Sequence, residues 1–400
     1  MTAKAVRERS GRILAAGEAG ELAHFTLHPD RLGQTADFVI DTMRRNYPDL
    51  AIPPHARWRH FQLAGTDRWR LLAKALDAGP DEIARIRIDL AVTSVLLDAG
   101  AGAAWRYRDP VSGVLLARSE GLAIASLEAF RAGLFSSRPA EPLRADCDGL
   151  AGSSAATLGA AFQVCPDNPL AGLGGRAALL NRLGKALAAS PEVFGADDPR
   201  IGHLFDAVRR DYPGGIAAAD LLAIVLAAFG SIWPARTVLG GINLGDTWRH
   251  PRAGPGTAGD RTNGLVPFHK LSQWLTYSLI EPLSEAGIAV TDIDGLTGLA
   301  EYRNGGLFID CGVLRFRDPS AHERRFAPGD ELIVEWRALT VALLDRLAPQ
   351  IRERLGRSAA DLSLASILEG GTWAAGRRIA GERRSGGGPP IAIESDGSVF

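Results

Sequence analysis

Acidic, basic and amide side chains recur between Phe268 and Arg337, within segments whose other residues are largely apolar. A charged group on an otherwise buried face is costly unless it is paired or takes part in chemistry. This part of the sequence therefore predicts a catalytic pocket. The side chains that carry the prediction fall in four short segments: Phe268-His269-Lys270-Leu271-Ser272-Gln273, Asp292-Ile293-Asp294-Gly295-Leu296-Thr297, Ala300-Glu301-Tyr302-Arg303 and Glu335-Trp336-Arg337.

Glu301 is the leading candidate for acid–base chemistry, with Asp292 as the alternative. Apolar residues flank Glu301 on both sides, from Leu296 to Ala300 and from Gly305 to Ile309. A carboxylate between apolar segments is partly desolvated, which raises its pKa and suits it to proton transfer. The competing interpretation is a surface charge pair at a helix end, which would contribute little to stability.

Lys270 and Gln273 are three residues apart, so one helical face would present an ammonium group beside an amide. Phe268, Trp274 and Tyr277 belong to the same segment. These aromatic side chains could form a wall for a planar ligand, or they could form an aromatic core cluster. The pattern leaves both interpretations open.

Glu335 and Arg337 are two residues apart and diverge on a helix, so one of them is expected to point inward. A buried Glu or Arg needs a partner. We expect an ion pair between Arg303 and Glu335, or between Glu301 and Arg337. Such a pair is compatible with catalysis because it would orient a carboxylate.

Asp246, Trp248 and His250 form a second group, in the loop from Asn243 to Gly264. An Asp after Gly at a tight turn usually bonds local backbone. Long loops are also frequent in binding sites. Either a local turn or a ligand-binding wall is consistent with this segment.

Composition excludes several classes of function. The chain has 400 residues, 46% of them hydrophobic and 23% charged, and its net charge is −1. Neither nucleic acid nor an anionic membrane is an expected partner. Three dispersed cysteines indicate free thiols in a reducing compartment. The start of the sequence has no secretory pattern, and the apolar run from Ala217 to Phe229 is too short to span a membrane. We therefore expect a soluble, cytoplasmic protein.

Helical periodicity dominates the chain, and strand patterns are few. We expect one mainly α-helical domain over residues 1–400, with the motif-bearing segment at 240–357 and a Gly/Pro-rich arm at 381–400. The arm could be a mobile linker or could fold over the site. Helices are expected at 36–45, 81–97, 119–135, 174–189, 217–229, 266–286, 328–355 and 358–368, and strands at 307–316 and 390–394.

The sequence lacks the common cofactor and metal motifs. Gly172-Leu173-Gly174-Gly175-Arg176 has neither the lysine of a P-loop nor a preceding strand, and there is no His-Glu-x-x-His, Cys-x-x-Cys or Gly-x-Ser-x-Gly. His55 and His60 are spaced awkwardly for one helical face, so we expect a hydrogen-bonding pair in an ordered loop. No cofactor and no metal ion are expected.

The four segments resemble the queuosine-salvage family of nucleotide N-glycosidases. Three family motifs are matched in order: the first by Phe268, Lys270 and Gln273, the second by Asp292, Leu296, Thr297, Ala300, Tyr302 and Arg303, and the third by Glu335, Arg337 and Ala338. The segment from Leu97-Asp98 to Trp105 is similar to a further family segment. This chain has Glu301 where the family has Asp, and Ser278 replaces another family Asp. The resemblance implies a helical, DNA-glycosylase-like domain and a different nucleotide substrate.

Nearly the full length is similar to uncharacterised uracil-catabolism proteins of fungi and bacteria. The matching segments are Ile52-Pro53-Pro54-His55, Arg59-His60-Phe61, Arg118-Ser119-Glu120-Gly121-Leu122, Gly245-Asp246-Thr247-Trp248, residues 371–377 and residues 395–400. The implied pathway makes UMP, opens the pyrimidine ring and releases urea. Together, the two resemblances imply cleavage of ribosylurea 5-phosphate to urea and ribose 5-phosphate.

This reaction suggests a role for each candidate residue. The candidate catalytic residues are Glu301, with Asp292 as the alternative, and Asp246; a carboxylate would stabilise an oxocarbenium-like state or activate water. The phosphate needs cations, and the urea group needs polar partners. The cations would be Lys270, Arg303 and Arg337; the polar partners would be Gln273, Asp246 and His250; the remaining candidate substrate contacts are Asp98, Trp248, Tyr302 and Glu335. Two alternatives remain: a hydrolase of an amide or ureido C–N bond, and a non-catalytic nucleotide sensor.

Overall fold

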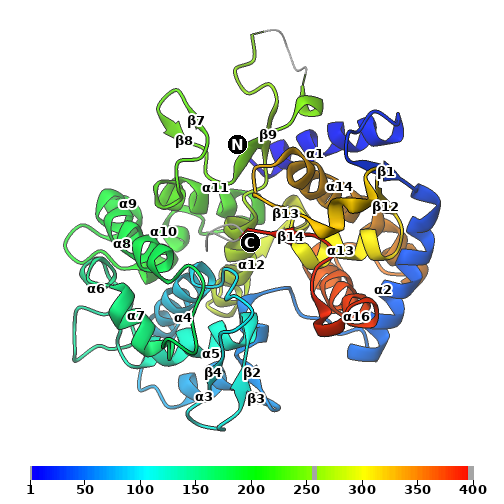
Figure 1. The fold of residues 1–400 in the computed structure, drawn as a ribbon. Helices are drawn as coiled ribbons and strands as arrows, with labels where there is room; N and C mark the ends of the chain where they lie inside the picture. The colour runs from blue at the N-terminus through cyan, green and yellow to red at the C-terminus, as the bar shows by residue number, and fades with distance from the viewer. Residues whose placement is uncertain (1, 255–258, 395–400) are drawn as a thin grey trace. The chain divides into compact units, whose positions relative to one another are not determined.

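The computed structural model describes residues 2–254 and 259–394, and helices account for most of them (Figure 1). The strands in this part of the chain are two or three residues long and pair only into two-stranded sheets. The expectation of a mainly α-helical fold is therefore confirmed. The finer expectation, a DNA-glycosylase-like architecture, stays a prediction.

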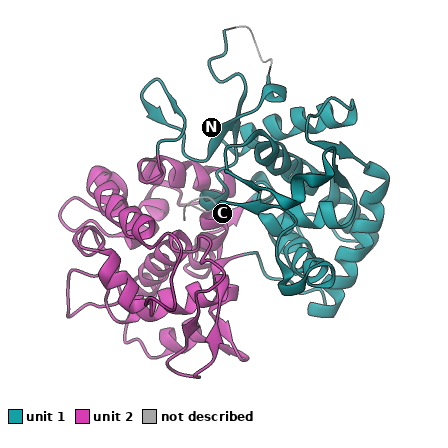
Figure 2. Cartoon of the chain, in the orientation of Figure 1, with its two compact units in different colours: residues 1–55, 235–273, 292–394 teal, residues 56–234, 274–291, 395–400 magenta. Residues whose placement is uncertain are grey.

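The described residues form two compact units, which Figure 2 shows in teal and magenta. The first contains residues 1–55, 235–273 and 292–394, and the second contains residues 56–234 and 274–291. Each unit is assembled from segments that are distant in the sequence. The expectation of one domain over the whole chain stays a prediction.

The helices of the first unit are α1 (Ala3–Glu18), α2 (Leu32–Asn46), α13 (Tyr302–Asp310), α14 (Glu331–Leu355), α15 (Leu364–Ser366) and α16 (Ala374–Arg383). Its strands are β1 (Phe25–Leu27), β7 (Val238–Leu239), β8 (Ile242–Asn243), β9 (Thr247–Arg249), β10 (Leu265–Pro267), β12 (Leu314–Phe316), β13 (Arg325–Phe326) and β14 (Ala392–Ile393).

The helices of the second unit are α3 (Arg68–Lys74), α4 (Pro80–Leu96), α5 (Arg118–Arg131), α6 (Cys147–Ala151), α7 (Ala155–Ala161), α8 (Leu173–Ala189), α9 (Pro191–Phe194), α10 (Leu204–Asp211) and α11 (Ala218–Phe229). Its strands are β2 (Gln62–Leu63), β3 (Thr66–Asp67), β4 (Tyr107–Arg108), β5 (Leu115–Leu116), β6 (Ile216–Ala217) and β11 (Val290–Thr291). Helix α12 (Lys270–Glu285) begins in the first unit and continues in the second.

Helix α14 forms the centre of the first unit. Most of its residues from Leu332 to Ile351 are buried, and it packs against α1, α2 and α13. The helix ends where Gly356 adopts a left-handed conformation with φ of 61°, which glycine tolerates without steric cost. The predicted helix over 328–355 is thus confirmed, with its start at Glu331.

Three expected elements differ from the structure. Residues 307–310 complete α13, and only 314–316 form a strand, because the apolar run also fits the buried face of a short helix. The segment 358–368 is not one helix: it leads through α15 into a π-helix at Ile367–Trp373. Val266 lies in β10 rather than at the start of α12.

The structure describes the Gly-rich arm as far as residue 394. Its strand β14 pairs in parallel with β13, which confirms a strand within the predicted range 390–394. Arg303 Nη1 donates a hydrogen bond to the carbonyl of Gly387 at 2.8 Å. Residues 381–394 therefore contact the segment that carries Glu301, whereas 395–400 lie outside the described residues. In the described ranges, no helix is long and apolar enough to cross a membrane.

Helices α13 and α16 pack closely together at Gly376. A Cβ on this residue would lie 2.1 Å from the backbone carbonyl oxygen of Arg303. We expect Gly376→Ala to lower the free energy of unfolding by about 3 kcal/mol, because the backbone cannot move aside without separating the helices. Urea denaturation measures the effect. Gly381→Ala is the matched control, since nothing lies within 4 Å of its added Cβ, and an equal loss in both variants would contradict this explanation.

Candidate functional site

Glu301 lies at the N-terminus of α13 and caps it. Its carboxylate accepts hydrogen bonds from the backbone N–H groups of Arg303 at 2.6 Å and Asn304 at 2.5 Å. These amides have no partner inside the helix, so an acidic side chain before the first turn is favoured. The sequence places an acid at this boundary, and the helix fixes the direction of its carboxylate.

The Glu301 side chain is buried, and burial raises its pKa above the ordinary value. The two backbone amides and the positive charges of Lys270 and His55 oppose this rise without cancelling it. The predicted elevation of the pKa is thus confirmed. A buried carboxylate with a raised pKa is a stronger base than a solvated one, and its charge is weakly screened.

His55 and Glu369 were not among the predicted site residues, yet the charge of His55 acts on Glu301. His55 Nδ1 and a carboxylate oxygen of Glu369 are 2.6 Å apart, and both side chains are largely buried. The His55 ring also lies 5.9 Å from the ring of Trp373. Glu369 is thus one partner of His55, and the His60 ring lies 5.9 Å from the Trp274 ring. The expected pairing of His55 with His60 stays a prediction.

Glu369 lies on the π-helix Ile367–Trp373. Such insertions are uncommon and occur often at functional sites. The sequence held a signal for this region, because Ile52-Pro53-Pro54-His55 and residues 371–377 are two of the segments that resemble uracil-catabolism proteins. It gave no indication that the two segments meet.

Asp246 forms a second cluster with Trp248, Phe268 and Arg337. The Arg337 guanidinium binds the Asp246 carboxylate through both terminal nitrogens, each at 2.7 Å. The indole nitrogen of Trp248 and the backbone N–H of Lys270 donate to the same carboxylate, at 2.7 Å and 3.1 Å. Arg337 also lies 4.1 Å from the centre of the Phe268 ring. Burial alone would raise the pKa of Asp246, but Arg337 and these donors hold it well below its usual range.

Lys270 connects the two clusters, because its backbone binds Asp246 and its side-chain charge acts on Glu301. Arg337 makes a second connection, from its Nε to the carbonyl oxygen of Ala300 at 3.3 Å. The structure therefore brings together Glu301, Asp246, Lys270 and Arg337 in the first unit. Their proposed roles in catalysis and binding stay predictions.

Arg303 and Tyr302 lie in the first turn of α13. The Arg303 guanidinium is 4.9 Å from the centre of the Tyr302 ring and binds Gly387. Arg303 is buried, whereas Tyr302 is partly exposed. Arg303 is a fixed cation near the candidate base, which is compatible with its predicted role toward a phosphate.

The expected ion pairs of Glu335 and Arg337 are replaced by others. Arg337 pairs with Asp246, as described, and Glu335 is fully buried with His250 as its neighbour, Oε2 to Nε2 at 3.3 Å. The other oxygen of Glu335 accepts from the backbone N–H groups of His24 and Phe25. Spacing on α14 predicted that one of the two side chains points inward, whereas both are buried and paired, and it could not identify their partners.

Gln273 has internal partners. Its amide nitrogen donates to Phe268 carbonyl and Thr297 Oγ1, and its amide oxygen accepts from the Thr297 backbone. It therefore joins the first and second motifs in the fold. Contact with a substrate's urea group stays a prediction that would require these bonds to rearrange.

Asp292 and Asp98 are the two remaining predicted residues. Asp292 is exposed, with left-handed backbone geometry before the 3₁₀ turn Ile293–Gly295. An exposed carboxylate lacks the desolvation that singles out Glu301, so Asp292 is the weaker candidate base. Asp98 belongs to the second unit, where it pairs with the fully buried Arg57 at 3.2 Å.

His269 is a further residue that the sequence reading did not assign. It has a left-handed backbone with φ of 48°, its ring is buried, and its Nε2 has no hydrogen-bond partner among the described residues. Burial lowers its pKa to about 4, against the nearby negative charge of Asp246. The imidazole is therefore neutral at pH 7 and leaves one polar atom for a ligand.

His269 should make the protein sensitive to mild acid. Its pKa is lower in the folded than in the unfolded state, so the unfolded chain binds more protons between pH 6.5 and 4. We expect wild type to lose about 2 kcal/mol of stability between pH 7 and 5 through this group. His269→Asn, which suits the left-handed backbone, should lose correspondingly less in urea denaturation. Identical pH dependence in both proteins would contradict the assignment.

With this geometry in view, the chain can be placed in a family. It matches the family described as "Protein of unknown function (DUF1688)" over residues 1–400, and it belongs to that family. It is similar to Protein urg3 of Schizosaccharomyces pombe, with 40% identity over 403 residues covering 99% of this chain and 96% of the relative. It is also similar to Uracil catabolism protein 4 of Lachancea kluyveri, with 38% identity over 414 residues covering 95% and 93%.

Proposed function

We propose that this protein acts in uracil catabolism and hydrolyses the N-glycosidic bond of a ring-opened nucleotide, ribosylurea 5-phosphate. The pathway is suggested by the printed name of a 38% identical relative that aligns over nearly the full chain. The reaction is suggested by one observation above all: Glu301 is a buried carboxylate with a raised pKa, fixed by two backbone amides and close to the charge of Lys270. In this arrangement Glu301 is a base whose carboxylate is held in place by backbone hydrogen bonds.

In the proposed reaction, the bond between the ribose C1 and the urea nitrogen breaks as positive charge develops on the sugar. The ionised Glu301 stabilises this charge and accepts a proton from water, whose oxygen forms the new bond to C1. The departing urea nitrogen takes up one proton from solvent, and Glu301 returns to solvent the proton that it accepted. The products are urea and ribose 5-phosphate, and the reaction needs no oxidant or reductant.

Lys270 and Arg303 are the proposed phosphate ligands. Lys270 is partly exposed, and its backbone N–H binds the Asp246 carboxylate. Arg303 presents a fixed guanidinium, and its backbone N–H binds the Glu301 carboxylate. Arg337 is less suited, because both of its terminal nitrogens are bound to Asp246. We propose that Arg337 positions Asp246 and Lys270. His269 Nε2 would supply a neutral polar contact to the urea group.

The direct experiment is incubation of the purified full chain with enzymatically prepared ribosylurea 5-phosphate, followed by separate assays for urea, ammonia and ribose 5-phosphate. Equal amounts of urea and ribose 5-phosphate support the proposal. Ammonia and carbon dioxide, with nitrogen left on the ribose, would identify a ureido C–N hydrolase. Saturable binding without turnover would identify a nucleotide sensor. Either of these last two outcomes overturns the proposed reaction.

A further inference from the structure

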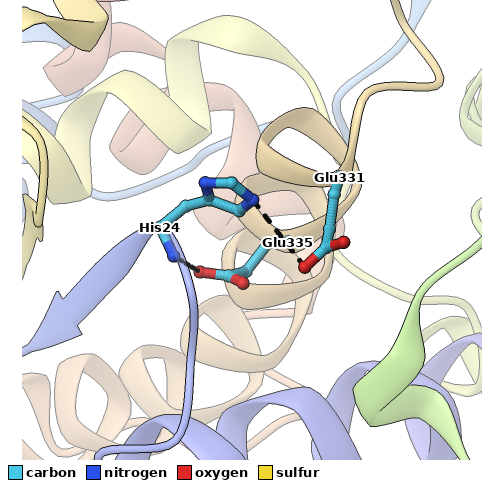
Figure 3. Close-up of side chains that lie close together, drawn as sticks. All are labelled: His24, Glu331 and Glu335. Carbon is cyan, nitrogen blue, oxygen red and sulfur yellow. Dashed lines mark hydrogen bonds and ion pairs between the residues drawn. The ribbon is translucent and has the colours of Figure 1, made fainter.

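Three potential metal ligands meet at the start of α14, apart from Glu301 and Lys270. Figure 3 shows His24, which immediately precedes β1, beside Glu331 and Glu335, which are one helical turn apart. His24 Nε2 lies 3.7 Å from a carboxylate oxygen of Glu331. One ligand atom from each of the three residues lies within 4.8 Å of the other two.

Glu335 is held rigidly in this cluster. It is fully buried, and its Oε1 accepts hydrogen bonds from the backbone N–H groups of His24 at 3.1 Å and Phe25 at 3.0 Å. These bonds fix its carboxylate relative to the segment that carries the His24 ring. Each carboxylate oxygen has two lone pairs, so these contacts leave acceptor capacity on Oε2.

His250 orients that second oxygen. The backbone N–H of Arg252 donates to His250 Nδ1 at 3.1 Å, so Nε2 is the nitrogen that carries hydrogen and faces Glu335 Oε2 at 3.3 Å. A hydrogen-bond donor behind a carboxylate ligand is the usual outer support of a metal site. This support comes from β9 and the turn after it, independently of the three cluster residues.

His24 and Glu331 make the cluster accessible to an ion, and the Glu331 side chain can change its position. The side chains of His24 and Glu331 are 33% and 42% exposed, so an ion can reach them from solvent. Metal–ligand bonds of about 2.0–2.2 Å place neighbouring ligand atoms roughly 3–3.6 Å apart. The His24–Glu331 separation is already close to that range, and rotation of the exposed Glu331 side chain can shorten the remaining distances.

We propose that His24, Glu331 and Glu335 bind one divalent transition-metal ion, with Zn²⁺ preferred over Mg²⁺ and Ca²⁺. An imidazole nitrogen favours zinc and its neighbours in the transition series, whereas Mg²⁺ and Ca²⁺ favour oxygen ligands alone. Three protein ligands leave at least one coordination position for water. The site ties β1 to α14, so the ion would also stabilise the fold there.

Isothermal titration calorimetry of the tag-free, chelator-treated full chain with ZnCl₂ tests this proposal, with MgCl₂ and CaCl₂ in parallel. We expect one Zn²⁺ per chain, a raised melting temperature, and much weaker binding of the other two ions. His24→Ala and Glu331→Gln should each weaken Zn²⁺ binding by at least about tenfold. Both residues are partly exposed, so the variants are expected to fold, as circular dichroism will check.

Glu323→Gln is the matched control. His322 and Glu323 form another exposed His–Glu pair at 3.7 Å in the same unit, outside the three-ligand group. This substitution should leave Zn²⁺ binding unchanged. Failure to bind Zn²⁺, wild-type affinity in both His24→Ala and Glu331→Gln, or equal affinity for Mg²⁺ would each overturn the proposal. None of these outcomes depends on turnover of ribosylurea 5-phosphate.

Discussion

Glu301→Gln is expected to reduce kcat/KM for ribosylurea 5-phosphate by about 10²–10⁴-fold, the usual contribution of a positioned acid–base group. The amide cannot accept a proton or carry the negative charge that stabilises an oxocarbenium-like state. Its size is close to that of the carboxylate, so the surrounding packing is retained. The cost to stability should be about 1 kcal/mol, from the weakened cap on the backbone amides of Arg303 and Asn304. Steady-state kinetics and urea denaturation measure the two effects.

Asp345→Asn is the control for neutralising a partly buried carboxylate. Burial raises the pKa of Asp345 too, but its partner is Arg7 on α1, outside the two clusters described around Glu301 and Asp246. This variant should keep its turnover. The wild-type pH profile adds a second readout: activity should rise with pH through a pKa above the ordinary value of about 4.3, because burial raises that of Glu301. Unchanged turnover in Glu301→Gln would exclude Glu301 as the catalytic base.

Asp246→Ala should be the most destabilising single change in the site, lowering the free energy of unfolding by about 3–5 kcal/mol. It leaves the Arg337 guanidinium buried without its bidentate partner, and it removes the acceptor for Trp248 and the Lys270 backbone. Activity should fall as well, because Lys270 loses the bond that positions it. Urea denaturation at pH 7 measures the stability loss, and kinetics on the folded fraction measures the second effect.

A double variant separates the charge effect from packing. Asp246→Leu combined with Arg337→Met removes both charges, and most of the lost stability should return, since apolar replacement of a buried pair is often close to neutral. The stability that Asp246 contributes depends on pH in a defined direction. Because the folded-state pKa of Asp246 lies below its unfolded value of about 3.9, its contribution is complete above that pH and is lost as pH falls through the folded pKa. A double variant no more stable than Asp246→Ala would contradict the ion-pair explanation.

The predictions about the site agree best with the structure where a side chain's environment depends on its neighbours in the sequence. The apolar residues on either side of Glu301 predicted desolvation, and the start of α13 adds the reason that the carboxylate is fixed there. The same reasoning was weaker for Gln273. Its spacing from Lys270 suggested a shared binding face, whereas in the fold its amide is bonded to Phe268 and Thr297.

Local pattern was sufficient for the helices with long periodic runs. The sequence by itself determined the mainly α-helical class, the course of α14, and the concentration of ionisable side chains between Phe268 and Arg337, because these follow from periodicity and from the cost of isolated charges. Only the tertiary structure decided that Arg337 pairs with Asp246, that His55 meets Glu369, and that Glu335 lies against His24 and His250. Each of these contacts joins residues far apart in the chain. A carboxylate accepts any suitable donor that the fold brings to it, so its partner is set by packing and not by spacing along the sequence.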